Sequence, residues 1–272
     1  MRTILVLLAL GVTIAAAAAA PPETSFLTPA RHAARVGERV SVQFSTATDA
    51  RLQPAAWPAP AKWLLLRGPT TQENRHDVQP AAGETAITVQ PQEPGLTLIG
   101  MDLEPVTTQL TGAELRDFAA RNVAEKATGR AEFPAADTAV PVRVVRSTKT
   151  LIRVTGERDA DASVTAVGKT GQHSEIQPLV DPTRAAVGSD VPLRVFIAGD
   201  KKTGVKVQVT SPGGQTTSFV TDSVGSGHFR VTEAGVWRVE GHHLVAPAGD
   251  NKEWTLYTAT LTFENTAKGG VQ

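Results

Sequence analysis

Cysteine is absent from all 272 residues, and this absence excludes several kinds of protein at once. A chain without cysteine has no disulfides, no cysteine-based zinc or iron–sulfur site and no cysteine nucleophile. It also lacks the residue through which a lipoprotein is anchored. We therefore expect the fold to depend on its hydrophobic core, for which a chain of this length is sufficient.

An excess of charge of one sign is also absent. Lys plus Arg and Asp plus Glu both number 27, so the formal net charge is zero. Nucleic-acid-binding proteins usually carry a basic excess or patch, and we expect no nucleic-acid partner. The sequence also has no nucleophile elbow, no phosphate loop, no dinucleotide fingerprint and no H-E-x-x-H. These absences favour a protein that is not an enzyme, with no catalytic residues to assign.

Long hydrophobic runs are scarce, and the one that exists stands at the start. Residues 1–20 read MRTILVLLALGVTIAAAAAA, with one Arg, an apolar stretch and several small-residue cleavage choices. This is the pattern of a secretory signal peptide. No second apolar span follows, so we expect a periplasmic or secreted protein without a membrane span after cleavage.

Short runs of alternating apolar and polar residues fill most of the remaining chain. Residues 221–264 contain three such runs with Gly, Asp and Pro between them, and one run places Trp237 and Val239 on the same side. This alternation predicts half-buried antiparallel strands. Residues 51–60 contain three prolines and are expected to form a loop instead. Further strands are expected at 40–44, 62–68, 84–90, 96–105 and 142–156.

A helical period occurs in one segment. Thr111 and Glu114 form a T-x-x-E capping box, and apolar residues such as Leu115 and Phe118 follow at helical spacing. The pattern predicts a helix from Thr111 to about Thr128, packed across an edge or end of the first sheet.

Two segments of the chain begin alike. Val36-Gly37 and Val187-Gly188 each precede an expected strand by three residues, which suggests two domains of one type. We predict an all-β fold with two β-sandwich-like domains, the second immunoglobulin-like, and one helix in the first. The predicted parts are the signal peptide (1–20), an N-terminal β domain (21–178), a C-terminal sandwich (179–266) and a flexible tail (267–272), with a linker in 175–182.

A series of short motifs runs along most of the chain. In order they are V-G-E-x-V (36–40), L-E-P (103–105), R-x-x-K-x-L (146–151), E-I-x-P (175–178), P-L-R-V (192–195), G-x-W (235–237), His243, E-W (253–254) and A-T-L-T-F-E (259–264). The ordered set resembles the DUF4198 family of exported bacterial proteins, which is grouped with nickel-uptake-associated periplasmic components.

The resemblance implies a non-catalytic periplasmic binding or accessory protein associated with nickel or cobalt uptake. Its expected partner is an envelope transport component or a TonB-type receptor. Relatives often begin the mature chain with H-D-x-W, whereas this chain reads PPETSFLTP there. The alternative is a structural envelope module that binds carbohydrate or another protein through its immunoglobulin-like domain.

Candidate metal ligands come from histidines and carboxylates. His243 is the first choice, with Glu253 across the following loop and His76 or Asp77, in an expected polar loop, as a further donor. Neutral imidazole and carboxylate suit nickel or cobalt, which are the candidate cofactors. The other interpretation is that His243 packs in the core while the adjacent His242 points to solvent, since neighbouring strand residues point apart.

Four tryptophans offer a second kind of site. Trp57, Trp63, Trp237 and Trp254 would suit a sugar-stacking platform if they were exposed together. Trp237 and Trp254 lie in expected strands, however, and we predict that both belong to the core.

Overall fold

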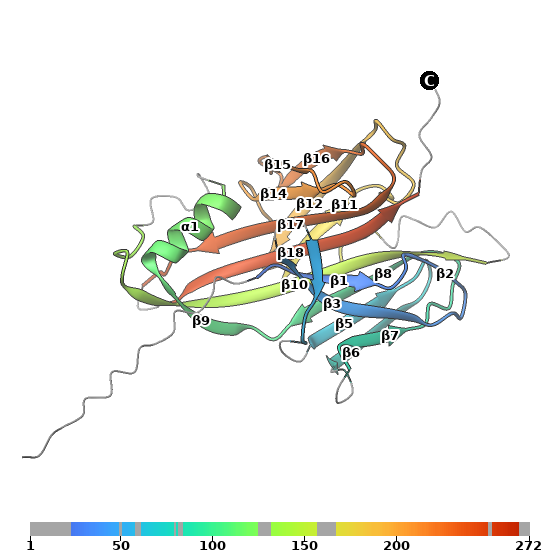
Figure 1. Cartoon of the computed structure of the whole chain (residues 1–272), viewed down its shortest axis with the longest axis horizontal. Helices are drawn as coiled ribbons and strands as arrows, with labels where there is room; N and C mark the ends of the chain where they lie inside the picture. The colour runs from blue at the N-terminus through green and yellow to red at the C-terminus, as the bar shows by residue number, and fades with distance from the viewer. Residues whose placement is uncertain are drawn as a thin grey trace, which may run out of the picture.

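The computed structural model describes residues 23–48, 51–57, 61–78, 80, 84–124, 132–156, 167–249 and 252–266. These residues form eighteen strands and one α-helix in three sheets (Figure 1). The prediction of an all-β fold with a single helix is confirmed. The predicted signal peptide and tail lie outside the described residues. Within the part that is described, no helix is long and apolar enough to cross a membrane.

The largest sheet has ten strands and extends through the whole molecule (Figure 1). Its strands are β2 (Ala33–Arg35), β5 (Ala61–Arg67), β6 (Gln72–Val78), β8 (Gly95–Leu103), β9 (Val106–Thr111), β10 (Ala139–Thr155), β14 (Lys206–Thr210), β15 (Thr216–Val220), β17 (Gly235–Val245) and β18 (Trp254–Asn265). Their order is β15-β14-β17-β18-β10-β8-β5-β6, and β2 and β9 also pair with β10.

Two smaller sheets cover parts of the large one. The first small sheet contains β1 (Ser25–Pro29), β3 (Val40–Thr48), β4 (Arg51–Pro54) and β7 (Ala86–Val89). The second small sheet contains β11 (Ser174–Pro178), β12 (Asp190–Ile197), β13 (Asp200–Lys201) and β16 (Ser226–Arg230).

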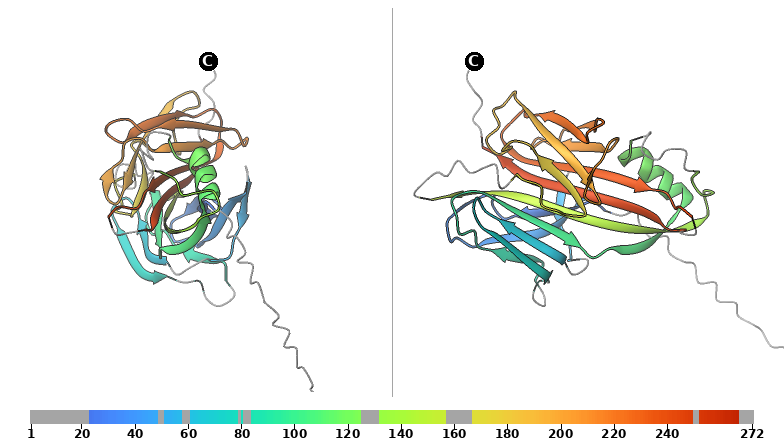
Figure 2. Two further views of the ribbon diagram at one scale, coloured as in Figure 1. Left: turned by 90° about the vertical axis from the view of Figure 1, so that its left-hand side faces the viewer. Right: turned by 180° about the vertical axis from the view of Figure 1, so that it is seen from behind.

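Each small sheet closes its own sandwich against the large sheet (Figure 2). In the first sandwich, Phe44 of β3 belongs to the same buried cluster as Met101 of β8. In the second, Val195 of β12 shares a cluster with Val239 of β17. The predicted pair of sandwich-like domains is therefore present. The two cores are neighbours through β8, which is buried along its whole length: Ile99 and its alternate neighbours face the first core, whereas residues such as Leu98 face the second.

β10 and β18 are the strands that connect the two halves. They pair in parallel over nine residue pairs, from Val142 with Trp254 to Thr150 with Thr262. Parallel neighbours need a long crossover connection. Here that connection includes the strands of the second small sheet and β14 to β17.

Threonines on these two strands hold β1 in place. The Thr260 hydroxyl donates to the carbonyl oxygen of Ser25 at 2.8 Å, and the Thr262 hydroxyl donates to that of Leu27 at 2.7 Å. The backbone N–H of Leu27 in turn donates to Thr148 Oγ1 at 3.0 Å. Side-chain hydroxyls thus satisfy backbone groups of β1 that have no strand partner on this side, and buried backbone groups require such partners.

The two glycines of the sequence repeat have similar backbone conformations. Gly37 has φ 75° and Gly188 has φ 92°, both in the region that favours glycine. Their N–H groups donate to the carbonyl oxygens of Pro91 and Val231, respectively. The repeat therefore marks the same tight entry into the strands β3 and β12.

Helix α1 (Gly112–Asn122) begins as predicted and ends earlier. The Thr111–Glu114 capping box is present, but the helix stops at Asn122 instead of near Thr128, because Val123 turns extended and is buried. The helix packs across one end of the large sheet, where its apolar face shares a buried cluster with residues of β9, β10, β17 and β18. Since β9 pairs with the first half of β10, it delivers the helix onto β17, where Phe118 meets His242 with ring centroids 5.5 Å apart.

Three segments expected to be loops or linker are strands instead. Residues 51–54 form β4, an edge strand that pairs with the end of β3 and finishes at Pro54, a position that tolerates proline. Residues 72–78 form β6, because they pair with β5 along its length. Residues 174–178 form β11, which pairs with β12.

Trp237 is predicted to be a principal contributor to stability. Its side chain is 3% exposed, packs at 5.5 Å from the Phe229 ring and donates from Nε1 to the Glu233 carbonyl oxygen. Trp237→Ala should therefore lower the free energy of unfolding by about 3–5 kcal/mol in urea denaturation. Val236→Ala, at a site 38% exposed on the same strand, is the control and should cost less than about 1 kcal/mol. Equal costs for the two variants would contradict the assignment.

Candidate functional site

His243 lies inside the second sandwich rather than at an open site. Its side chain is 5% exposed, and its Nδ1 has no hydrogen-bond partner among the described atoms. Burial, with a smaller effect of the nearby Lys202, lowers the pKa of His243 to about 4. The imidazole is therefore neutral at neutral pH, which is the form that binds metals.

His242 differs from its prediction. It was expected to face solvent, but it is 1% exposed beneath helix α1, with its ring edge-on to Phe118. Its Nδ1 lies 3.4 Å from Thr258 Oγ1 and its Nε2 lies 3.4 Å from Glu240 Oε2. The outward face of β17 is polar in sequence, and two packed elements make it an interior face. Helix α1 covers His242, and Phe26 of β1 lies against Arg238.

The other predicted donors do not meet His243. His243 pairs with Tyr257, whereas Glu253 lies four residues before Tyr257, just ahead of β18 and roughly 13 Å away at strand spacing. There Glu253 accepts a hydrogen bond from Thr107. His76 and Asp77 are on β6, five strands from β17 in the sheet order, which is roughly 24 Å. No group of three or more potential metal-binding side chains occurs in the described residues.

The tryptophans do not form a shared platform. Trp237 and Trp254 are each 3% exposed, as predicted for core residues. Trp57 packs on Phe44 in the first sandwich, and Trp63 packs against the second core. These side chains therefore serve different parts of the hydrophobic interior.

A buried ion pair lies where the two sandwiches meet. Lys149 Nζ of β10 is 2.9 Å from Glu175 Oε1 of β11, and the side chains are 1% and 0% exposed. Glu175 also accepts hydrogen bonds from the backbone N–H groups of Thr170 and Gly171. Burial acts to raise the pKa of Glu175, but the Lys149 charge and these donors together hold it below its ordinary value.

One buried cluster contains the residue types of a hydrolase triad, namely Ser147, Asp102 and His173. Its contacts differ from those of a triad. Ser147 Oγ donates to Asp102 Oδ1 at 2.6 Å, and His173 contributes its backbone N–H to Asp102 Oδ2. In a catalytic triad the serine instead bonds an imidazole. Ser147 is also 2% exposed, and burial raises the pKa of Asp102. This cluster therefore connects β8, β10 and the segment before β11, and does not present a nucleophile.

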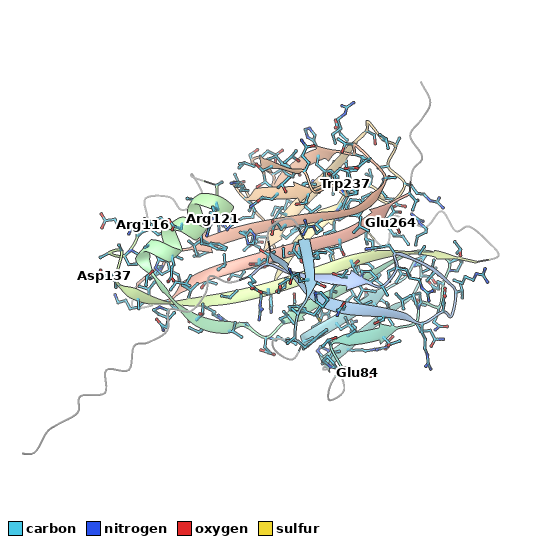
Figure 3. The ribbon with its side chains drawn as sticks, viewed as in Figure 1. Glu84, Arg116, Arg121, Asp137, Trp237 and Glu264 are labelled. Carbon is cyan, nitrogen blue, oxygen red and sulfur yellow. The ribbon has the colours of Figure 1, made fainter. Side chains whose placement is uncertain are left out.

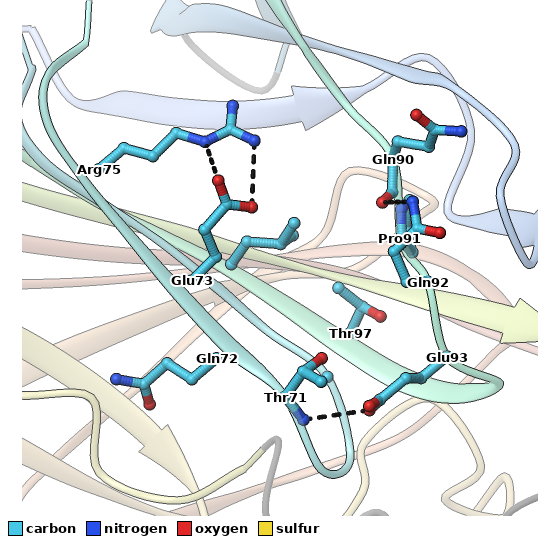
Figure 4. Close-up of a pocket in the computed structure, with 11 residues that line it drawn as sticks. Thr71, Gln72, Glu73, Arg75, Gln90, Pro91, Gln92, Glu93 and Thr97 are labelled. Carbon is cyan, nitrogen blue, oxygen red and sulfur yellow. Dashed lines mark hydrogen bonds and ion pairs between the residues drawn. The ribbon is translucent and has the colours of Figure 1, made fainter.

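An open polar cleft lies at the corner of the first sandwich (Figure 4). Its volume is about 310 Å³, near the lower limit for small-molecule sites. One wall comes from β6 and the turn before it, and the other from the segment that follows β7. The lining residues are Leu66, Gly68, Thr71, Gln72, Glu73, Arg75, Gln90, Pro91, Gln92, Glu93 and Thr97.

The charged residues of this cleft occupy inward positions of the sheet. Glu73 is paired with Leu66, and Arg75 with Leu64, a residue of the first core. Residues directly opposite each other on antiparallel strands point to the same face. Glu73 and Arg75 therefore point toward the sandwich side, where hydrophobic side chains would be expected. They form an ion pair, with Arg75 Nε 2.6 Å and Nη2 3.1 Å from the two Glu73 carboxylate oxygens.

Glu93 keeps the two walls in position. Its carboxylate accepts hydrogen bonds from the backbone N–H groups of Thr70 and Thr71, at 2.8 and 3.2 Å, and from the Thr70 hydroxyl. Partial burial acts to raise the pKa of Glu93, but these donors hold it below its ordinary value. Gly68 leaves room for this contact, since a Cβ there would lie 2.9 Å from Glu93 Oε2.

The sequence interpretation missed this cleft because its residues come from separate segments without a motif. The one available signal was β6 itself. Residues 72–76 are all polar and all exposed, so they lack the alternation of apolar and polar residues that predicts a strand. The segment was therefore expected to be a loop.

The family model for DUF4198, a domain of unknown function, matches residues 23–244. The chain therefore belongs to the DUF4198 family. No curated protein shows significant sequence similarity to it.

Several solved structures are distantly similar to this chain. A bacterial 1.5-MDa ice-binding adhesin is 10% identical with a TM-score of 0.27, over 92% of this chain and 67% of that one. A Ca²⁺-stabilised adhesin of an Antarctic bacterium is 11% identical with a TM-score of 0.26, over 93% of this chain and 50% of that one. Fibronectin(III)-like modules of Clostridium thermocellum CbhA are 7% identical with a TM-score of 0.21, over 90% of this chain and 99% of theirs. Similarity at this level indicates nothing about the function of this chain.

Because the other predicted ligands lie far from His243, we predict that His243 does not contribute to Ni²⁺ binding. We expect isothermal calorimetry of metal-free protein with Ni²⁺ to give the same result for the wild type and for His243→Ala, because a single buried imidazole holds a metal weakly. A binding event that the wild type shows and the variant loses would instead establish His243 as a ligand.

The buried ion pair leads to a prediction about stability and pH. Lys149→Met leaves the Glu175 carboxylate buried without its counter-charge and should cost about 3–5 kcal/mol near pH 7, measured by urea unfolding. Lys149→Met/Glu175→Gln removes both charges and should recover part of that loss.

The sign of the pH effect follows from the lowered pKa of Glu175. In the wild type its stabilising effect is complete above the unfolded pKa and is lost as the pH falls through the folded pKa. In Lys149→Met the carboxylate is destabilising while it is charged, so that variant gains from protonation. The difference in free energy of unfolding between the wild type and Lys149→Met should therefore shrink toward about pH 4. A difference that grows in acid would show that Glu175 is not ionised in the native pair.

Proposed function

We propose that the protein is a non-catalytic binding module of the bacterial envelope, periplasmic or secreted, whose ligand site is the polar cleft between β6 and residues 90–93. The observation that carries this proposal is the ion pair of Glu73 and Arg75 at inward positions of the sheet. Charged groups at such positions are costly unless they meet water or a ligand. The open cleft of about 310 Å³ provides that access.

The chemistry of the cleft favours binding over catalysis. Its two carboxylates and its guanidinium already have partners: Glu73 pairs with Arg75, and Glu93 binds the Thr70–Thr71 turn. None of its lining residues is a histidine or a serine. A ligand would therefore meet a set of fixed hydrogen-bond donors and acceptors rather than a nucleophile with a base.

An accessory role in nickel or cobalt uptake, with a transport component or TonB-type receptor as partner, is the other candidate. It rests on the family resemblance. The neutral imidazole of His243 has the protonation state that a metal requires, but the geometry adds no second donor to it. The cleft is therefore the site that the geometry supports better.

We expect ligands to bind at the cleft and to remain unchanged. The test is ¹⁵N-labelled protein titrated, class by class, with neutral sugars, organic acids, amino acids, dipeptides and Ni²⁺. At least one class should shift the amide resonances of residues 71–75 and 90–93, while the ligand is recovered chemically intact. Shifts confined to the neighbourhood of His243, no shifts with any class, or conversion of a ligand would each overturn the proposal.

A further inference from the structure

The charged groups of the cleft already have partners, and this limits the class of ligand. The lining contains two carboxylates, Glu73 and Glu93, and one guanidinium, Arg75. Arg75 is already paired with Glu73 through two contacts. An anion would meet the excess negative charge of this set. The two carboxylates that would attract a cation are already held, Glu73 by the Arg75 guanidinium and Glu93 by the Thr70–Thr71 turn. The cleft therefore matches a ligand without net charge.

The ion pair offers a donor and an acceptor side by side. Arg75 uses Nε and Nη2 on Glu73, which leaves further N–H donors of the guanidinium. The Glu73 oxygens retain acceptor capacity, since an ionised carboxylate has about four lone-pair sites. A hydroxyl group both donates and accepts, so two neighbouring hydroxyls of one ligand would satisfy both partners. Hydrogen bonds to charged groups are also stronger than those between neutral groups.

The opposite wall supplies acceptors at fixed positions. Gln90 Nε2 donates to the Gly37 carbonyl oxygen at 2.7 Å, and Gln92 Nε2 donates to that of Gln90 at 2.9 Å. Each amide group is thereby oriented, and its Oε1 atom remains an acceptor. Figure 4 shows these glutamines on the opposite side of the view from the Glu73–Arg75 pair.

The floor of the cleft has mixed polarity. Leu66 is a partly buried apolar residue that packs against the first core, and Thr97 on β8 is 2% exposed. Small-molecule sites combine apolar surface with a few oriented polar groups, and Leu66 supplies apolar surface here. A sugar ring has the corresponding surface, with C–H groups on its face and hydroxyls around its rim.

Resting on the proposed function, we infer that the ligand is a neutral saccharide, whose adjacent hydroxyls bind the Glu73–Arg75 pair and whose ring lies over Leu66. The lining contains no aromatic side chain. Binding therefore depends on hydrogen bonds to the ion pair, and removal of that pair should abolish it.

The test uses the purified ¹⁵N-labelled protein with maltotriose, cellotriose and xylotriose as neutral probes, and glucuronic acid and glucosamine as charged ones. At least one neutral trisaccharide should shift residues 71–75 and 90–93 in a saturable way. The charged sugars should bind more weakly. Glu73→Gln/Arg75→Gln should weaken trisaccharide binding by about tenfold or more, since hydrogen bonds to charged groups are stronger than those between neutral groups.

A matched control keeps the test specific. Arg116→Gln/Asp117→Asn also removes one positive and one negative charge, from exposed positions of α1. Figure 3 shows Arg116 far from Glu84, which precedes β7 and the cleft residues 90–93. This variant should bind like the wild type. Thermal unfolding should show that both double variants are folded, because Glu73 and Arg75 are exposed.

The outcomes separate this inference from the proposed function. If dipeptides, amino acids or organic acids shift the cleft residues and the trisaccharides do not, the binding module stands and the saccharide inference is wrong. Trisaccharide binding that survives Glu73→Gln/Arg75→Gln also overturns it. If no probe of any class perturbs the cleft, both proposals fail.

Discussion

The parallel pairing of β10 with β18 is the interaction on which the rest of the structure depends. Thr148 and Thr260 face each other although they are 112 residues apart in the chain. Since parallel strands cannot be joined by a tight turn, the intervening segment has to leave the sheet and return. It forms the second sandwich on the way. Both hydrophobic cores are thereby attached to one sheet, and Leu98 and Leu151 from the first half complete the core of the second.

Polar side chains, rather than apolar ones, fix the position of several elements on this pair of strands. Thr260 and Thr262 bind the backbone of β1, and Lys149 binds Glu175 of β11. Such groups are costly when buried without partners, so only the arrangement that satisfies them is stable. An apolar contact would tolerate a shift of β1 along the sheet, whereas these hydrogen bonds define its register.

The cleft is a consequence of how unequal sheets meet. The first small sheet has four strands and the large sheet has ten, and β6 is the outer strand of the large sheet at this corner. Inward-pointing charges on an edge strand also discourage pairing with another chain. The Glu73–Arg75 pair can therefore protect the edge and supply the donor and acceptor groups of a binding site. Both roles depend on its access to water.

The sequence by itself determined the fold class, most of the longer strands, the start of the helix and the burial of Trp237, because these follow from residue alternation, capping and turn chemistry within short segments. It also determined, through its ordered motifs, the family. The tertiary structure decided which strands are neighbours, that His242 lies beneath α1, and that His243 and His76 are far apart. It alone brought Glu73 and Gln92 to one cleft. Contacts between distant segments depend on the order of strands in a sheet. The pattern of residues within a short segment does not specify that order.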